Sequence, residues 1–214
     1  AKYIFSKINI NPIYIKDKPN GKNINYNCGS LNPEFLAKEV KKKSADFGIS
    51  FDGDGDRLTC CDEKGKIIDG DHIIALLAKY YIKGSRLKKI NAVVGTLMSN
   101  SGLENFINKI GLKFYRAKIG DKFVYEIMKK KDCFLGGEQS GHIIIKEYGP
   151  SGDGILISLL LIKIISKNNQ QASKIFNIYN PFFQIQKNIK FKDSANKKNI
   201  KINDLKKFYN NKLI

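Results

Sequence analysis

The sequence predicts an α/β protein in which mixed β-sheets are sandwiched by helices. Two observations support this class. Short apolar runs of strand length alternate with segments of about ten residues whose apolar side chains repeat at helical spacing, which is typical of βαβ units. In addition, the 214 residues and the 42% hydrophobic content allow one or two domains with a sizeable core.

Individual elements follow from local signals. Asn32 and Pro33 favour a helix start, because Asn can cap a helix and Pro suits its first turn. After Pro181 the chain becomes rich in Lys and Asn, which predicts a linker and the unfinished start of another element over 187–214. In chain order, the pattern predicts a strand within 3–15, a long loop at 17–27, a helix over 32–43, strands at 45–51 and 58–61, a brief strand, a helix over 71–81, a strand at 92–95, a helix over 101–110, a strand at 113–116, a helix over 122–130, a strand at 133–136 and a helix over 154–166.

The net charge does not by itself indicate a nucleic-acid partner. It is +18, from 38 basic and 20 acidic side chains, and such a balance often accompanies nucleic-acid or membrane binding. However, only Arg57, Arg86 and Arg116 are arginines, whereas base reading and bidentate phosphate contacts favour arginine. We therefore attribute the charge to solvated lysine faces, and we expect no nucleic-acid partner and no membrane partner.

The cysteines and the apolar runs favour a cytoplasmic location. The four cysteines lack the spacing of a zinc site or a disulfide framework. The longest apolar run, 155–165, is shorter than the roughly 20 residues of a membrane helix. The chain opens at Ala1 within strand-like sequence and shows no signal-peptide pattern, so we expect a fragment that begins inside a domain.

An acidic, glycine-rich loop follows the strand expected at 45–51. Asp52, Asp54 and Asp56 stand at alternate positions, separated by two glycines that permit a tight curve. Three neighbouring carboxylates are costly unless a cation neutralises them, and oxygen ligands favour Mg²⁺ or Ca²⁺. The loop is therefore a candidate metal site.

Two other interpretations of this loop are an EF-hand, which the sequence argues against, and a solvated acidic turn. An EF-hand would also place Asp at its first, third and fifth positions, but it needs glycine where Arg57 stands and helices where the flanks look like strands. A solvated acidic turn stays open on the loop alone, because Asp-Gly runs are common in turns.

A second polar loop follows the strand expected at 133–136. Glu138, Ser140 and His142 alternate along it, an arrangement that suits the vicinal hydroxyls of a sugar. Taken alone, the same residues could equally form a hydrogen-bonded turn, with His142 as a packed side chain.

Together, the two loops resemble those of the alpha-D-phosphohexomutase superfamily, and within it most closely the bacterial phosphoglucosamine mutases. The resemblance covers roughly residues 5–192 and depends on the combination of the motifs at 52–57 and 137–142. Supporting matches occur in the family order at Asn23-Ile-Asn25, Cys28-Gly-Ser30, Asp69-Gly-Asp71, Gly95-Thr-Leu-Met-Ser-Asn100, Ile119-Gly-Asp121 and Ser151-Gly-Asp-Gly154.

The resemblance implies a four-domain enzyme that interconverts glucosamine 6-phosphate and glucosamine 1-phosphate on the way to cell-wall precursors. It would act through a phosphoserine and a bisphosphorylated intermediate. Metal and guanidinium groups would stabilise the transferring phosphoryl group. The implied residues are Asp52, Asp54 and Asp56 for Mg²⁺, Arg57 for charge stabilisation, and Glu138, Ser140, His142, Asp121 and Lys122 for the sugar-phosphate substrate.

The sequence also departs from the family pattern. It contains no Ser-His pair, so the family's nucleophilic serine loop is missing, and the phosphate-binding loop of the last domain is missing too. Lys122 stands where the family usually has arginine and offers a point charge in place of a bidentate fork. We expect residues 1–68 to be the end of domain two, 69–181 domain three, and 182–214 a linker with the start of domain four. The missing domains one and four of the same enzyme would then be its partners, and this fragment alone would be inactive.

Two alternatives remain open within the resemblance. A phosphomannomutase or phosphoglucomutase of the same superfamily is one, although Gln139 between Glu138 and Ser140 leans toward glucosamine. A non-catalytic remnant that keeps Mg²⁺ or sugar-phosphate affinity is the other.

Overall fold

The computed structural model describes residues 1–83 and 90–185 of the chain. The chain divides into two compact units, Ala1–Phe182 and Phe183–Ile214, and the following description concerns the first. Arg86 and the element expected over 187–214 lie outside the described residues.

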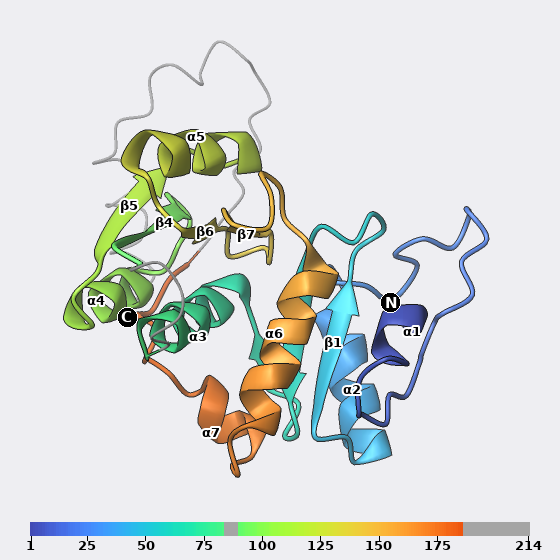
Figure 1. The fold of residues 1–214 in the computed structure, drawn as a ribbon. Coiled ribbons are helices and arrows are strands. Elements are labelled where there is room, and N and C mark those ends of the chain that lie inside the picture. Colours follow the sequence, from blue (N-terminus) through green and yellow to red (C-terminus); the bar gives the residue numbers. More distant parts are fainter. Residues whose placement is uncertain (84–89, 186–214) are drawn as a thin grey trace, which may run out of the picture. The chain divides into compact units, whose positions relative to one another are not determined.

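Figure 1 shows the helices and strands, which alternate one by one over residues 70–137. The helices are α1 Lys2–Phe5, α2 Pro33–Lys43, α3 Gly70–Lys83, α4 Ser101–Lys109, α5 Asp121–Lys131, α6 Gly154–Ser166 and α7 Ala172–Phe176. The strands are β1 Phe47–Phe51, β2 Leu58–Asp62, β3 Ile67–Ile68, β4 Ala92–Thr96, β5 Lys113–Ala117, β6 Leu135–Gly137 and β7 Ile143–Ile145. The predicted α/β class with mixed sheets and covering helices is confirmed.

The first sheet is an antiparallel meander in the order β1-β2-β3. Phe51 pairs with Leu58, so residues 52–57 form the loop of the β1–β2 hairpin. Helix α2 packs closely on this sheet at Gly48, where an added Cβ would lie 2.5 Å from Val40 Cγ2. The flanks of the acidic loop are therefore strands, which confirms the argument against an EF-hand.

The second sheet has the order β5-β4-β6-β7. Strands β5, β4 and β6 are parallel, and β7 returns antiparallel to β6. Helix α5 covers one face, while α3 and α4 cover the other (Figure 1). The loops that leave β4, β5 and β6 emerge at the same edge, which is where open α/β sheets commonly bind ligands.

One hydrophobic cluster joins the two sheets. It contains Leu58 and Cys60 of the first sheet, Val93 and Leu135 of the second, and buried residues of α3 and α6. Apolar residues on the α5 face of the second sheet form a separate cluster. The shared cluster fixes the acidic loop of the first sheet relative to the loop edge of the second.

Two local expectations need correction, and two elements lie where the pattern predicts none. The strand within 3–15 is wrong, because Lys2–Phe5 forms a helical turn in which the Phe5 amide bonds to Ala1 O at 2.9 Å. The pattern predicts neither strand β7 nor helix α7, although three consecutive isoleucines signal the strand. Asn32 precedes α2 but does not cap it with its side chain, which instead donates to Cys28 O at 3.0 Å.

Candidate functional site

The acidic loop brings its three carboxylates together. Oxygen atoms of Asp52, Asp54 and Asp56 all lie within 4.8 Å of one another. The loop is held from inside, because Asp52 Oδ1 accepts hydrogen bonds from the backbone amides of Gly55 at 3.1 Å and Arg57 at 3.2 Å. Asp54 is exposed, whereas the Asp52 side chain is only 11% exposed. The loop thus presents three oxygens to one point near the surface.

These residues fit a hard divalent cation such as Mg²⁺. Asp56 Oδ1 is buried and has no hydrogen-bond partner among the described residues, so one anionic oxygen is left without a proton donor. The Arg57 Nε atom lies 4.0 Å from that oxygen and 3.9 Å from Asp52 Oδ2, too far for a hydrogen bond. A set of carboxylate oxygens is the donor set that Mg²⁺ and Ca²⁺ prefer.

The second polar loop connects β6 and β7 as a tight hairpin. The Glu138 amide donates to His142 O at 2.9 Å, and the Gly141 amide donates to Glu138 O at 3.0 Å. Glu138 is 8% exposed, while Ser140 is exposed at the turn. Ser140 Oγ lies 3.5 Å from Glu138 Oε2, so the carboxylate and the hydroxyl are neighbours.

Glu138 is also anchored to the start of α5. Its Oε1 accepts a hydrogen bond from the Gly120 amide at 2.9 Å, at the end of the helix where the backbone dipole favours an anion. Asp121 and Lys122 occupy the first turn of the same helix and are exposed. The structure therefore places the predicted residues Asp121 and Lys122 beside the anchoring point of Glu138.

The two polar loops meet in space. Arg57 and His142 form an antiparallel backbone bridge, and the Leu58 amide donates to Gly141 O at 3.3 Å. Gly141 has a φ of +93°, and a Cβ there would lie 2.0 Å from Leu58 O, so only glycine permits this approach. The acidic loop and the Glu138 loop are thus in direct backbone contact.

His142 joins the loops by its side chain as well. It is 2% exposed, its Nδ1 lies 2.9 Å from Asp56 Oδ2, and its Nε2 accepts from the Gly152 amide at 3.0 Å. Because Nε2 accepts a hydrogen bond, the ring proton is on Nδ1 and is donated to Asp56. His142 therefore orients a carboxylate of the acidic loop, and its contact with a substrate stays a prediction.

The Ser151–Gly154 segment supports the acidic loop, a contact that the sequence pattern does not predict. The Gly154 amide donates to Gly55 O at 2.9 Å, and a Cβ at Gly152 would lie 2.6 Å from Asp56 O. The two closely spaced glycines were the available signal, since glycine often marks a close backbone approach. This segment leads directly into α6, whose N-cap is Asp153.

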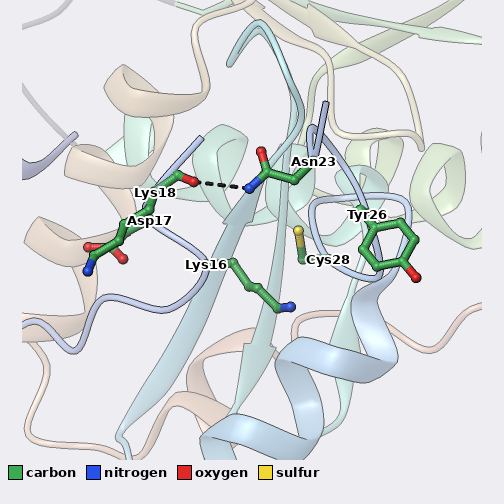
Figure 2. A pocket seen from close by; sticks show the side chains of 6 residues that line it. All are labelled: Lys16, Asp17, Lys18, Asn23, Tyr26 and Cys28. Carbon is green, nitrogen blue, oxygen red and sulfur yellow. Dashed lines mark hydrogen bonds between the residues drawn. The ribbon is translucent and has the colours of Figure 1, made fainter. Parts of the chain in front are cut away.

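A separate pocket of about 230 Å³ lies in the N-terminal segment, and Figure 2 shows its lining side chains. None of the predicted site residues lines it. Its rim contains a local hydrogen bond from Asn23 Nδ2 to Lys18 O at 3.0 Å, drawn as a dashed line. Its lining residues are Lys16, Asp17, Lys18, Asn23, Tyr26 and Cys28.

The chain resembles known proteins along most of its length. Residues 69–182 match the family described as "Phosphoglucomutase/phosphomannomutase, alpha/beta/alpha domain III". Phosphoglucosamine mutase from Nautilia profundicola is 46% identical over 189 residues, which is 88% of this chain and 43% of that protein. Phosphoglucosamine mutase from Thermodesulfovibrio yellowstonii is 45% identical over 198 residues, 92% of this chain and 44% of that protein.

Solved structures share the fold. A phosphoglucomutase/phosphomannomutase family protein from Burkholderia thailandensis superposes with a TM-score of 0.63 at 26% identity, over 71% of this chain and 33% of that one. N-acetylphosphoglucosamine mutase from Aspergillus fumigatus, solved with GlcNAc-6P and magnesium, gives a TM-score of 0.60 at 20% identity, over 76% of this chain and 42% of that one.

The chain spans less than half the length of the curated relatives it matches. No helix among the described residues is both long enough and apolar enough to cross a membrane. Since the matched region 69–182 makes up more than half of the sequence, the chain belongs to the phosphoglucomutase/phosphomannomutase family.

Proposed function

We propose that this chain carries the metal-binding and sugar-binding parts of a phosphoglucosamine mutase, which interconverts glucosamine 6-phosphate and glucosamine 1-phosphate. The observation that carries the proposal is the meeting of the acidic loop and the Glu138 loop through the Arg57–His142 bridge. An enzyme that moves a phosphoryl group on a sugar needs charge stabilisation and hydroxyl recognition at the same place. Identities of 42% to 46% with phosphoglucosamine mutases support the choice of glucosamine.

The acidic loop is the proposed binding site for Mg²⁺. Asp52, Asp54 and Asp56 would hold it, and when bound it would supply positive charge for the oxygens of the transferring phosphoryl group. The Arg57 side chain is 40% exposed beside the same carboxylates, with its Nε atom buried. It can therefore reach a phosphoryl oxygen without first leaving a buried ion pair.

The Glu138 loop is the proposed sugar site. Glu138 Oε2 and Ser140 Oγ lie side by side and can accept from and donate to adjacent hydroxyl groups of one sugar ring. Because the carboxylate is fixed at the start of α5 by Gly120, it needs no rearrangement before binding. Asp121 and Lys122, exposed at that helix start, are proposed to complete the substrate site, with Lys122 as a cation for the substrate phosphate.

The rest of the reaction needs parts outside this chain. We assign residues 1–68 to the end of domain two, 69–181 to domain three, and 182–214 to a linker and the start of domain four. The nucleophilic serine, which would become phosphorylated, is assigned to domain one of the complete protein. This arrangement makes the other domains of the same enzyme the partners of this chain, in the cytoplasm and in the pathway to cell-wall precursors.

The test is a coupled mutase assay of the protein encoded by the complete open reading frame. It compares glucosamine 1-phosphate, glucose 1-phosphate and mannose 1-phosphate, each with Mg²⁺ and a trace of the corresponding bisphosphate. The proposal expects the highest kcat/KM for glucosamine 1-phosphate. Faster turnover of glucose or mannose 1-phosphate would assign the protein to that branch of the family, and no turnover of any of the three would indicate a non-catalytic remnant.

A further inference from the structure

Asp69 lies between the start of α3 and the Glu138 loop. It occupies the N-cap position of α3, because its Oδ1 accepts from the His72 amide at 3.1 Å and its carbonyl accepts from the Ile73 amide at 3.2 Å. The same Oδ1 also lies 2.7 Å from His72 Nδ1. One oxygen of Asp69 is therefore committed to the helix.

The second oxygen of Asp69 binds the Glu138 loop. Its Oδ2 accepts from Gln139 Nε2 at 3.2 Å, and the Gly70 amide donates to Gln139 O at 2.9 Å. Gly70 has no room for a side chain, since a Cβ would lie 2.1 Å from Glu138 O. Asp69 and Gly70, at the start of α3, thus hold Gln139 by its side chain and by its backbone carbonyl.

The Asp69 carboxylate is itself well fixed. His72 is 7% exposed, and its ring stacks on Tyr179, with ring centroids 4.7 Å apart. Burial alone would raise the pKa of Asp69, but the hydrogen bonds and charge of His72 outweigh it and hold the pKa below its usual value. Asp69 therefore stays ionised at neutral pH and acts as an acceptor for Gln139.

Glu138, Gln139 and Ser140 differ in what their side chains contact. The side chains of Glu138 and Ser140 approach each other at 3.5 Å, whereas Gln139 bonds to Asp69. We propose that Gln139 is a positioning residue for sugar recognition: through its bond to Asp69 it fixes the backbone that carries Glu138 and Ser140, and it does not contact the sugar. This inference rests on the proposed function for the identity of the ligand.

The experiment is a double-mutant cycle in the complete protein. Gln139→Met keeps the length of the side chain and removes its amide. Asp69→Ser keeps a hydroxyl that can cap α3 but removes the oxygen that Gln139 reaches. Gln170→Met, at an exposed glutamine in the turn after α6, is the matched control.

Two readouts separate a positioning role from a direct contact. In hydrogen exchange by mass spectrometry, each single variant should speed exchange of the segment 138–142 by about fivefold to tenfold, the loss expected for one hydrogen bond. In mutase kinetics, each should raise KM for glucosamine 1-phosphate by a similar factor with little change in kcat, because binding weakens equally in ground and transition states. In both exchange rate and KM, the double variant should be no more impaired than the more impaired of the two single variants. Gln170→Met should match the wild type.

Two results would overturn the inference. Unchanged exchange of 138–142 in Gln139→Met would show that the bond does not hold the loop. A KM increase from Gln139→Met that is the same in the Asp69→Ser background would show that Gln139 contacts the substrate directly. If the wild-type protein has no mutase activity, the proposed function fails, and the exchange measurement still decides whether Gln139 positions the loop.

Discussion

Replacing His142 by Phe keeps an aromatic ring in a buried position but removes both ring nitrogens. The substitution leaves Asp56 Oδ2 without the donor at 2.9 Å and the Gly152 amide without the acceptor at 3.0 Å. A hydrogen bond to a charged group contributes about 1.5–3 kcal/mol, and a buried amide left unpaired costs about 1–3 kcal/mol. Because the Asp56 side chain is 29% exposed, water can replace part of the first bond, so we expect a loss near the low end of the summed range, about 3 kcal/mol.

The assay is urea unfolding followed by circular dichroism, with a thermal melt as a second measurement. For a chain of this size, about 3 kcal/mol corresponds to a decrease in Tm of roughly 6–12 °C. His72→Phe is the matched control: it can keep the stacking on Tyr179 and loses only the ring bond to an Asp69 side chain that is 34% exposed, so it should cost about 1 kcal/mol. A loss below about 0.5 kcal/mol in His142→Phe would refute the claim that this ring joins the two loops.

Three further substitutions test other parts of the structure. Gly141→Ala should destabilise the protein by more than about 3 kcal/mol in urea unfolding, since its Cβ would meet Leu58 O at 2.0 Å. Gly111→Ala is the control: its φ is +84° but the space around it is open, so it should cost only about 1 kcal/mol. Equal losses in the two variants would contradict the close approach. Arg116→Lys should cost about 2 kcal/mol because lysine cannot reproduce the two bonds to Glu104 together with those to two carbonyls, and a neutral result would show that the fork is dispensable. Burial raises the pKa of Asp71 to about 6, so between about pH 4 and 6 the folded state holds a proton that the unfolded state has already released. The free energy of unfolding should therefore fall as the pH rises through this window. Asp71→Asn should remove up to about 3 kcal/mol of that decrease, and an unchanged pH profile of the free energy of unfolding would count against it.

Much of the fold could be predicted from local signals. The helix α2 begins at Pro33, as the Asn-Pro pair predicts, and the strands that flank the acidic loop end and begin within a residue of their expected positions. These elements have strong periodicity and buried apolar faces, so local pattern and tertiary packing agree. The strand expected within 3–15 fails because most of its apolar side chains stay exposed, among them Tyr3 at 76% and Ile13 at 54%.

The arrangement of the site depended on long-range contacts that a sequence pattern does not contain. The acidic loop is recognisable from its alternating Asp and Gly residues, but its contact with His142, 86 positions away, arises from the cluster shared by the two sheets. The roles of Gly152 and Gly154 could not be assigned for the same reason. Both glycines act through backbone atoms, which every residue type has. A glycine at either position therefore indicates only that there is little room for a side chain.

The measurement that tests the central claim most directly is a Mn²⁺ titration of the 214-residue chain, followed by NMR line broadening. If the acidic loop binds a divalent cation next to the sugar loop, the amide signals of Gly53, Gly55 and Gly141 should broaden together with an affinity of about 1 mM, as expected for a partly exposed site of few ligands. Gly111, which precedes β5 at the end of the sheet away from these loops, should not broaden with them. Asp54→Asn should abolish the effect, and Asp46→Asn should leave it intact. Broadening that is uniform over the chain, or that persists unchanged in Asp54→Asn, would contradict the account.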